Sequence, residues 1–204
     1  LTGGTGFIGK KFISLASKKG FNVFAVSRKK IKKKTKNVKW LKGEMDSDWG
    51  NYFSKVDVVV HLASRGVINK KKEDKIKILN FNVLKSFYFI LNAIDNNCRK
   101  FVIASTSSEY FNDGDSNNYK LDIKSNRESS TIYSLSKIIF IDMLKIISRK
   151  VNCNFRIMRI FPTYGEGEHK SRLYPTIKKC AQKNKNLYVK TPNEYRDFTK
   201  VEYV

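Results

Sequence analysis

Leu1-Thr2-Gly3-Gly4-Thr5-Gly6-Phe7-Ile8-Gly9 is the stretch that decides the fold, because its glycines have the spacing G-x-x-G-x-x-G. Apolar residues recur at helical period after this turn, and Gly20 stands where such a helix would end. Glycine permits a tight turn, lets backbone approach a pyrophosphate without a Cβ, and allows close packing of helix on strand. The positive end of the helix then favours phosphate. The stretch predicts a dinucleotide site, which needs support from the rest of the chain because three glycines alone are a weak signal.

Beyond this turn, apolar strands alternate with amphipathic helices. The expected strands span 21–26, 38–41, 56–63, 101–104 and 155–161. The expected helices span 49–55, 75–97, 132–150 and 173–185. Runs rich in β-branched residues, such as Val56-Asp57-Val58-Val59-Val60, are typical of buried parallel strands. The alternation predicts the α/β class with a doubly wound parallel sheet.

The composition restricts the choice of partners. With 41 Lys and Arg against 18 Asp and Glu, the formal net charge of +23 would suit nucleic acid, an anionic membrane surface or a phosphate-bearing ligand. Lys and Asn are abundant along the whole sequence, so the charge also fits a general compositional bias. No apolar run approaches the roughly 18 residues of a membrane span. We therefore expect no membrane partner.

The cysteines and histidines indicate a reducing compartment and no metal site. Cys98, Cys153 and Cys180 are odd in number and far apart, which favours free thiols in a cytoplasmic protein. His61 and His169 are too few for a histidine-based metal cluster. Because the chain opens without Met and ends within a pattern, we interpret it as a piece of a longer protein.

A second motif, Tyr133-Ser134-Leu135-Ser136-Lys137, carries candidate chemistry. Tyrosine and lysine at positions i and i+4 share one face of a helix. A nearby ammonium is expected to lower the phenol pKa, so that Tyr133 can act as a general acid or base near neutral pH. The hydroxyl cluster Ser105-Thr106-Ser107-Ser108 ends a predicted buried strand, and in open α/β sheets ligands bind at that edge.

These segments together resemble an extended short-chain dehydrogenase/reductase of the NAD-dependent epimerase/dehydratase family, whose members act on nucleotide-activated sugars. The resemblance covers nearly the whole chain. The matching segments are Thr2-Gly3-Gly4-Thr5-Gly6-Phe7-Ile8-Gly9, His61-Leu62-Ala63-Ser64, Asn82, Thr106 with Tyr110, Tyr133 with Lys137, Arg159-Ile160-Phe161-Pro162-Thr163-Tyr164-Gly165, and Arg196-Asp197-Phe198 with Val201-Glu202.

The resemblance implies a catalytic triad. Tyr133 would exchange a proton with a sugar hydroxyl or ketone, Lys137 would bind the nicotinamide ribose, and Thr106 would orient the reacting oxygen. Besides Tyr133 and Lys137, the implied cofactor contacts are Gly3, Gly6, Phe7, Ile8, Gly9, Ser27, Arg28, Glu44, Met45, Leu62, Ala63, Ser64, Asn82, Ser105 and Phe161. The implied substrate contacts are Thr106, Ser107, Pro162, Arg172 and Arg196.

The same resemblance implies how the chain is divided and assembled. Residues 1–165 would form an NAD(P)-binding Rossmann domain, and residues 166–204 would begin a small C-terminal substrate-binding lobe. A homodimer is expected through the helices at 75–97 and 132–150.

Two departures from the family pattern matter. Pro162 replaces the usual Asn, and Ser107-Ser108 replace the Asp-Glu that follows the catalytic Thr in sugar-nucleotide dehydratases, which argues against dehydration.

The end of the second strand bears on the choice of cofactor. NAD-binding enzymes place an acid there for the ribose 2′-OH, whereas an Arg suits the 2′-phosphate of NADP. Ser27-Arg28-Lys29 contains no acid, so NADP is favoured, with NAD as the alternative. NADP favours net reduction, and the expected reaction is reduction of a nucleotide-linked 4-keto-6-deoxyhexose. The alternatives are nucleotide-sugar 4-epimerisation and, more remotely, a non-catalytic nucleic-acid-binding module.

Overall fold

A computed structural model describes the chain except residues 33, 69–73, 111–120, 122 and 190–195. Its longer strands all pair in parallel: β1 with β2, β3 with β4, and β4 with β5. They are β1 (Val23–Ser27), β2 (Val38–Lys42), β3 (Val59–His61), β4 (Lys100–Thr106) and β5 (Asn154–Ile160).

Leu1 and Thr2 connect the two groups of strands. Val26 N donates to Leu1 O at 2.9 Å, and Thr2 N donates to Val60 O at 3.0 Å. Thr2 and His61 also form a parallel bridge. The resulting order is β2, β1, the Leu1–Thr2 segment, β3, β4 and β5, so that the order of the parallel strands reverses beside the glycine turn. This order is that of a dinucleotide-binding sheet, and it confirms the predicted α/β class with parallel strands.

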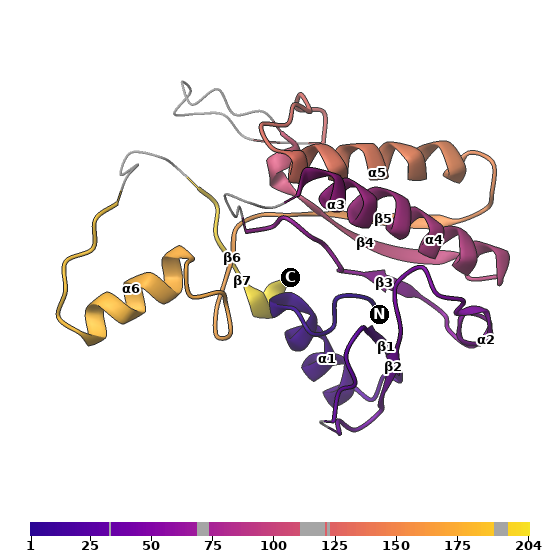
Figure 1. The fold of residues 1–204 in the computed structure, drawn as a ribbon, viewed down its shortest axis with the longest axis horizontal. Helices are drawn as coiled ribbons and strands as arrows, with labels where there is room; N and C mark the ends of the chain where they lie inside the picture. The colour runs from indigo at the N-terminus through magenta and orange to yellow at the C-terminus, as the bar shows by residue number, and fades with distance from the viewer. Residues whose placement is uncertain (33, 69–73, 111–120, 122, 190–195) are drawn as a thin grey trace.

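Helices cover the sheet on two sides (Figure 1). They are α1 (Phe7–Lys18), α2 (Gly50–Phe53), α3 (Lys75–Leu79), α4 (Ser86–Asp95) and α5 (Ile132–Ser148). A π-helical segment, η1 (Asn80–Lys85), joins α3 to α4, so the single helix predicted at 75–97 is one continuous rod with a wider turn inside it. Helices α4 and α5 lie side by side over β3 to β5, and α1 lies on the other side of the sheet.

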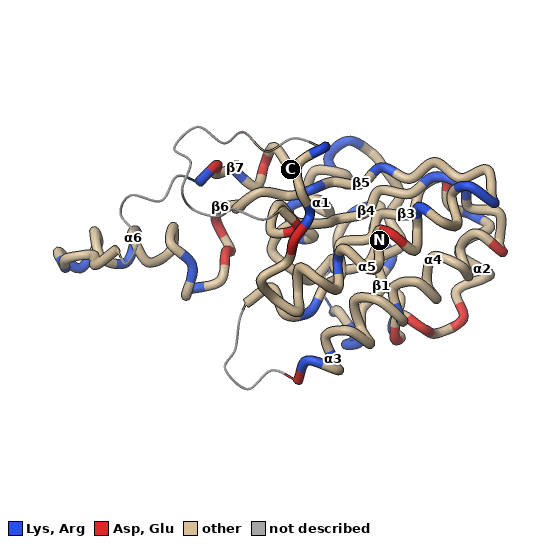
Figure 2. Tube along the Cα trace, turned by 90° about the horizontal axis from the view of Figure 1, so that it is seen from above, with Lys and Arg blue, Asp and Glu red and all other residues tan. Residues whose placement is uncertain are grey.

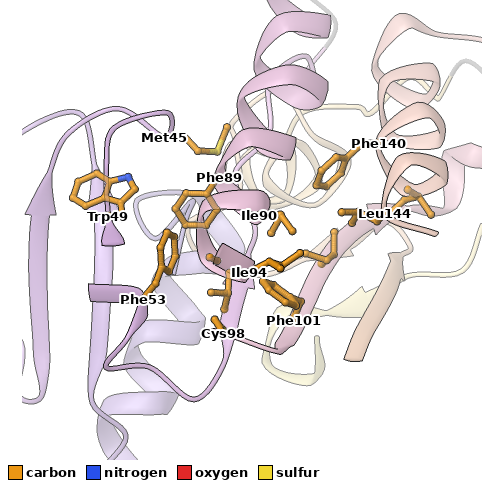
Figure 3. Close-up of a cluster of buried hydrophobic side chains, with 14 of the residues drawn as sticks. Met45, Trp49, Phe53, Phe89, Ile90, Ile94, Cys98, Phe101, Phe140 and Leu144 are labelled. Carbon is orange, nitrogen blue, oxygen red and sulfur yellow. The ribbon is translucent and has the colours of Figure 1, made fainter. Parts of the chain in front are cut away.

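The main core lies between this helix pair and the sheet. Apolar residues at helical spacing turn one face of α5 inward, and Phe140, Ile141 and Leu144 are almost completely buried. Phe53 and Phe89 meet edge to face with their ring centroids 5.1 Å apart. Figure 3 shows these side chains converging from α2, α4, α5 and β4. Burial of apolar surface, worth about 25 cal/mol per Å², therefore holds α5 against the face of the sheet over β4.

The C-terminal part leaves the sheet and returns to it. Its elements are β6 (Thr163–Tyr164), α6 (Leu173–Gln182), β7 (Thr199–Lys200) and the 3-10 turn η3 (Val201–Tyr203). Helix α6 buries no residue and extends away from the other helices (Figure 1). Strand β7 pairs with β6, Val201 is buried, and Lys11 Nζ lies 2.7 Å from Glu202 Oε1 on α1's side of the sheet. The division at residue 165 stays a prediction, and residues 199–204 pack on the first part.

Neither a membrane-crossing helix nor a metal-binding cluster occurs in the described residues. None of the helices there is both long and apolar enough to span a bilayer. No three or more His, Cys, Asp and Glu side chains in the same ranges are grouped so that they could hold a metal ion. Cys98, Cys153 and Cys180 are all free thiols.

Candidate active site

The glycine turn packs directly against the end of β3. Gly3 has a φ of +72°, and a Cβ on it would lie 2.6 Å from Ala63 N, so a side chain there is excluded both by conformation and by space. A Cβ on Gly9 would lie 2.2 Å from Gly3 O. Gly6 N donates to Gly3 O at 2.9 Å and closes the turn. The spacing of the three glycines is therefore required by backbone contacts.

The start of α1 fits a pyrophosphate. Gly6 is the N-cap of α1 and makes no side-chain capping bond. The first-turn N–H groups, which include those of Phe7 and Ile8, have no carbonyl four residues earlier within the helix. These donors and the positive helix end suit an anion, and the missing Cβ atoms leave backbone surface for it to approach. The residues present thus fit the diphosphate of NAD or NADP.

His61, at the end of β3, is a structural residue. Its Nδ1 lies 2.9 Å from Thr2 Oγ1 and its Nε2 lies 3.1 Å from Ser86 Oγ. Burial, assisted by the positive charge of Lys137, lowers the pKa of His61 to about 3. The imidazole is therefore neutral, and it joins β3 to α4 while Thr2 Oγ1 accepts a bond from Ala63 N at 3.2 Å.

Asn82 lies inside the protein, in the π-helical segment. Its Nδ2 donates to Arg65 O and to Ser136 Oγ, each at 2.9 Å, and its Oδ1 accepts from Arg65 N at 2.8 Å. The side chain thereby ties the loop after β3 to α5. These bonds hold the loop that carries Ser64, and the cofactor contact of Asn82 that the resemblance implied stays a prediction. Insertions of this helix type often occur at functional sites.

The three triad residues meet at the carboxyl edge of β4. Thr106 is the last residue of β4, and Thr131 caps α5 by accepting a bond from Ser134 N at 3.1 Å, which sets the position of Tyr133 in the first turn. The side chains of Ser64 and Thr106 interact with the Tyr133 phenol and favour its ionised form. One turn later, Lys137 Nζ donates to Ala104 O at 2.9 Å. Residues from β3, β4 and α5 are thus brought together.

The expected direction of the Tyr133 pKa is wrong for this structure. Burial raises the pKa of the phenol, and the charge of Glu109 also raises it, although hydrogen bonds from Ser64 and Thr106 and the charge of Arg172 oppose this rise. Burial lowers the pKa of Lys137 to about 8, against the opposing charge of Glu109. The reason is that both groups lose water when α5 packs on the sheet, and desolvation always favours the neutral form.

The residues expected around the adenine side differ in exposure. Arg28 and Glu44 are exposed, just after β1 and β2 respectively. Ser27 Oγ accepts a bond from Lys29 N at 3.2 Å. Met45 is buried, and its side chain packs in the main core (Figure 3).

The expected substrate residues are spread over three segments. Ser107 begins the 3-10 turn η2 (Ser107–Glu109) directly after Thr106. Pro162 O accepts from Thr199 N at 2.9 Å, so the segment after β5, which also includes Phe161, is bound to β7. Arg172, the N-cap of α6, donates to Val67 O at 3.1 Å, while Arg196 is exposed before β7. The charge of Arg172 acts on Tyr133 and lowers its pKa, and a contact of Arg196 with substrate stays a prediction.

Three charged residues beside the triad were not predicted from the sequence. Glu109 has a fully buried side chain, and its Oε2 lies 3.3 Å from both Arg127 Nε and Arg159 Nε. Its only sequence signal was a carboxylate within the turn that follows a buried strand. Arg127 gave none, because a residue 18 positions along the chain can be brought back only by tertiary folding.

Comparison with known proteins shows the family to which this chain belongs. The model of the NAD dependent epimerase/dehydratase family matches residues 1–204. A dTDP-D-glucose 4,6-dehydratase of Dictyostelium discoideum is 26% identical over 212 residues, which cover 93% of this chain and 49% of that protein. The chain thus spans about half the length of this curated relative.

Solved structures of similar fold include a UDP-N-acetylglucosamine 4-epimerase from Methanobrevibacter ruminantium M1 in complex with UDP-N-acetylmuramic acid, with a TM-score of 0.85 at 20% identity. That match covers 98% of this chain and 68% of the epimerase. MoeE5 in complex with UDP-glucose and NAD gives a TM-score of 0.82 at 21% identity, covering 98% and 66%. At such identities the likeness shows the fold alone. Because the family model matches its whole length, the chain belongs to the NAD-dependent epimerase/dehydratase family.

Proposed function

We propose that the protein is an NAD(P)-dependent oxidoreductase that reduces a nucleotide-linked 4-keto-6-deoxyhexose. The observation that carries the proposal is the placement of the Tyr133 phenol beside Thr106 at the carboxyl end of β4, next to the strand end against which the glycine turn packs. A ligand at this edge would meet the phosphate-binding start of α1 and the Tyr133 hydroxyl together.

The charge states of the side chains suit reduction. A phenol whose pKa is raised carries its proton at neutral pH, so Tyr133 can donate it to the C4 carbonyl oxygen of the sugar. Thr106 can hydrogen-bond the same oxygen and hold it in line with the phenol. The hydride would come from a nicotinamide cofactor held at the start of α1. Lys137, positively charged below a pKa of about 8, stabilises the tyrosinate that remains.

Dehydration is not supported by the residues that follow Thr106. Ser107 and Ser108 offer hydroxyls where an acid and a base would be needed. The nearby carboxylate of Glu109 is completely buried and paired with two arginines, so it does not face a ligand. We therefore place this chain with the reductases of the family, although its curated relative is a dehydratase.

The second candidate is nucleotide-sugar 4-epimerisation. It is favoured by the likeness to epimerase structures and by the NAD bound in the MoeE5 structure. An epimerase would use the same triad, first as a base toward the C4 hydroxyl and then as an acid toward the keto intermediate. The same residues therefore support both reactions, and the cofactor distinguishes them.

We propose NADP as the cofactor. Arg28 is exposed immediately after β1, where a guanidinium can pair with a 2′-phosphate. Ser27 and Lys29 on either side carry no negative charge that would repel it. NAD is the alternative, because Glu44, also exposed, stands after the neighbouring strand β2.

We propose a homodimer through η1, α4 and α5. These helices expose large apolar side chains on the face that points away from the sheet: Leu84, Tyr88, Leu135, Ile139 and Ile146. Apolar surface of this kind on two adjacent helices is typical of a helix-on-helix interface. The three free thiols support a cytoplasmic location.

Nucleic-acid binding is not proposed. The lysine-rich run at 29–36, of which residue 33 lies outside the described residues, follows Arg28. Figure 2 shows Lys and Arg positions scattered over α6, α3 and the β5 side of the molecule, not gathered on one groove or stripe. This distribution fits a solvated basic surface.

Arg28→Asp should weaken NADPH binding by at least ~10-fold in a fluorescence titration of the full-length protein, because the charge-assisted pair with the 2′-phosphate is worth about 1.5–3 kcal/mol. NADH binding should change by less than about threefold. Lys30→Asp makes the same charge change two residues further along an exposed segment and serves as the control. NAD binding that is tight and indifferent to Arg28 would favour the epimerase.

Tyr133→Phe should lower kcat by roughly 10²–10⁴-fold with 4-keto-6-deoxy sugar nucleotides, because the proton donor is lost. Cofactor affinity should stay nearly constant, since the ring remains. Tyr52→Phe removes a hydroxyl from the other end of the core and should leave kcat unchanged. Turnover of UDP-glucose by the parent protein, with no reduction of keto sugars, would point instead to the second candidate.

Lys137→Met should reveal the cost of the buried ammonium. Because the folded pKa of about 8 lies below the ordinary 10.5, the unfolded chain binds more protons between these values, and stability gains from rising pH. The free energy of unfolding of the parent protein, relative to Lys137→Met, should therefore increase by about 2 kcal/mol from pH 8 to pH 10. Urea denaturation at both pH values measures this. A constant difference would show that Lys137 is not desolvated.

Ile139→Glu should convert the dimer to a monomer in sedimentation velocity at micromolar concentration, because a carboxylate would be buried at the interface. Ile177→Glu, at an exposed position of α6, is the matched control and should leave the mass unchanged. A parent protein that is already monomeric at this concentration would exclude the proposed interface.

A further inference from the structure

A buried carboxylate ties together the elements that hold the triad. Ser105 Oγ, on β4, donates to Glu109 Oε1. Glu109 Oε2 lies 3.3 Å from Nε of Arg127 and 3.3 Å from Nε of Arg159, which is on β5. The Glu109 side chain is fully buried, whereas both arginine side chains are 18% exposed. A charge in such a position is retained only with strong partners, and here it has three.

Arg127 extends this network to α5. Its Nη1 lies 2.7 Å from Asp142 Oδ1, and its Nη2 donates to Ile138 O at 3.4 Å. Ile138 and Asp142 both belong to α5, the helix that carries Tyr133 and Lys137. They follow Lys137 by one and five residues. One carboxylate therefore links β4, β5 and, through Arg127, α5.

We propose that Glu109 is a positioning residue whose carboxylate fixes the end of β4 against α5 and sets the charge balance of the Tyr133–Lys137 pair. This role rests on the proposed function, because it concerns the proton donor of that reaction. It requires no contact between Glu109 and the substrate.

The charges around the pair decide the direction of the effect. The carboxylate of Glu109 raises the pKa of both Tyr133 and Lys137, since its negative charge opposes a tyrosinate and favours an ammonium. It thus adds to the effect of burial on the phenol and opposes the effect of burial on the amine. The other titratable or charged groups that face this cluster are Tyr110, whose ring lies 5.5 Å from Arg159 Cζ, and Arg127, Arg159, Arg172, Asp142 and His61.

The 3-10 turn that follows Thr106 sets the position of Glu109. Thr106 Oγ1 accepts from Ser108 N at 3.2 Å and starts the 3-10 turn, which directs the third residue, Glu109, back under β4. Ser105 and Glu109 are four residues apart and both point inward, while Thr106 between them lies beside Tyr133. Loss of the carboxylate would therefore release Ser105 and leave two guanidiniums without their shared partner.

The test is a titration of Tyr133 that needs no substrate. In the full-length protein labelled with ¹³Cζ-tyrosine, the Tyr133 resonance is assigned by comparison with Tyr133→Phe, and its NMR titration gives the midpoint. Glu109→Gln should move this midpoint down by about one pH unit or more. Arg127→Gln, which removes a cation and leaves Glu109, should move it up. Asp142→Asn alters only the half-exposed outer partner of Arg127 and should shift it little.

A second readout is the pH dependence of kcat. Glu109→Gln should shift the acidic and the basic limb of the plot of kcat against pH to lower pH. Glu109→Asp, which keeps the charge, should return both limbs toward the parent values. A structural role alone would reduce kcat without moving the limbs. Unchanged Tyr133 midpoints in folded Glu109→Gln and Arg127→Gln would overturn the proposal. If Glu109→Gln does not fold, the upward shift in Arg127→Gln decides it. If the parent protein does not reduce keto sugars but the Tyr133 midpoint shifts as expected in the variants, the proposed function is refuted and the role of Glu109 stands.

Discussion

The close approach of the glycine turn to the end of β3 is the constraint on which the rest of the structure depends. Gly3 can lie against Leu62 and Ala63 only because it has no Cβ and adopts a positive φ. This contact places the start of α1 beside the carboxyl ends of β3 and β4. Thr2 then bonds to Ala63 N and lies against His61, so that the phosphate-binding turn and the sheet form one unit. The triad would otherwise stand at a sheet edge with no anion site next to it.

Burial of charge is the second organising feature. Lys137 donates to Ala104 O inside the protein, and Glu109 is buried between two arginines close by. Desolvation alone would neutralise the lysine, and the carboxylate opposes this. Buried ion pairs contribute little net stability compared with apolar packing, so stability alone does not explain this cluster. The apolar core between α4, α5 and the sheet supplies the stability that these charges cost.

Much of the fold could be predicted from local patterns. The glycine spacing, the β-branched run before His61 and the helical period of α5 each depend on neighbouring residues, and all three elements are present. The candidate site was harder to predict. Asn82 binds Arg65 and Ser136, partners 17 and 54 positions away, and such distant partners cannot be read from a local pattern. The expected direction of the Tyr133 pKa was wrong, since a helical spacing to Lys137 says nothing about the water that burial removes.

The sequence by itself determined the class of the fold, the glycine turn and the pairing of Tyr133 with Lys137 on one helix face, because each rests on spacing along the chain. Only the tertiary structure decided which groups surround them. In the folded chain Lys137 donates to Ala104 O, and Arg127 and Arg159 pair with Glu109. Val201 is buried in the turn that contacts α1. These contacts join residues far apart in sequence, and their energies depend on distance and desolvation, which exist only after the chain has folded.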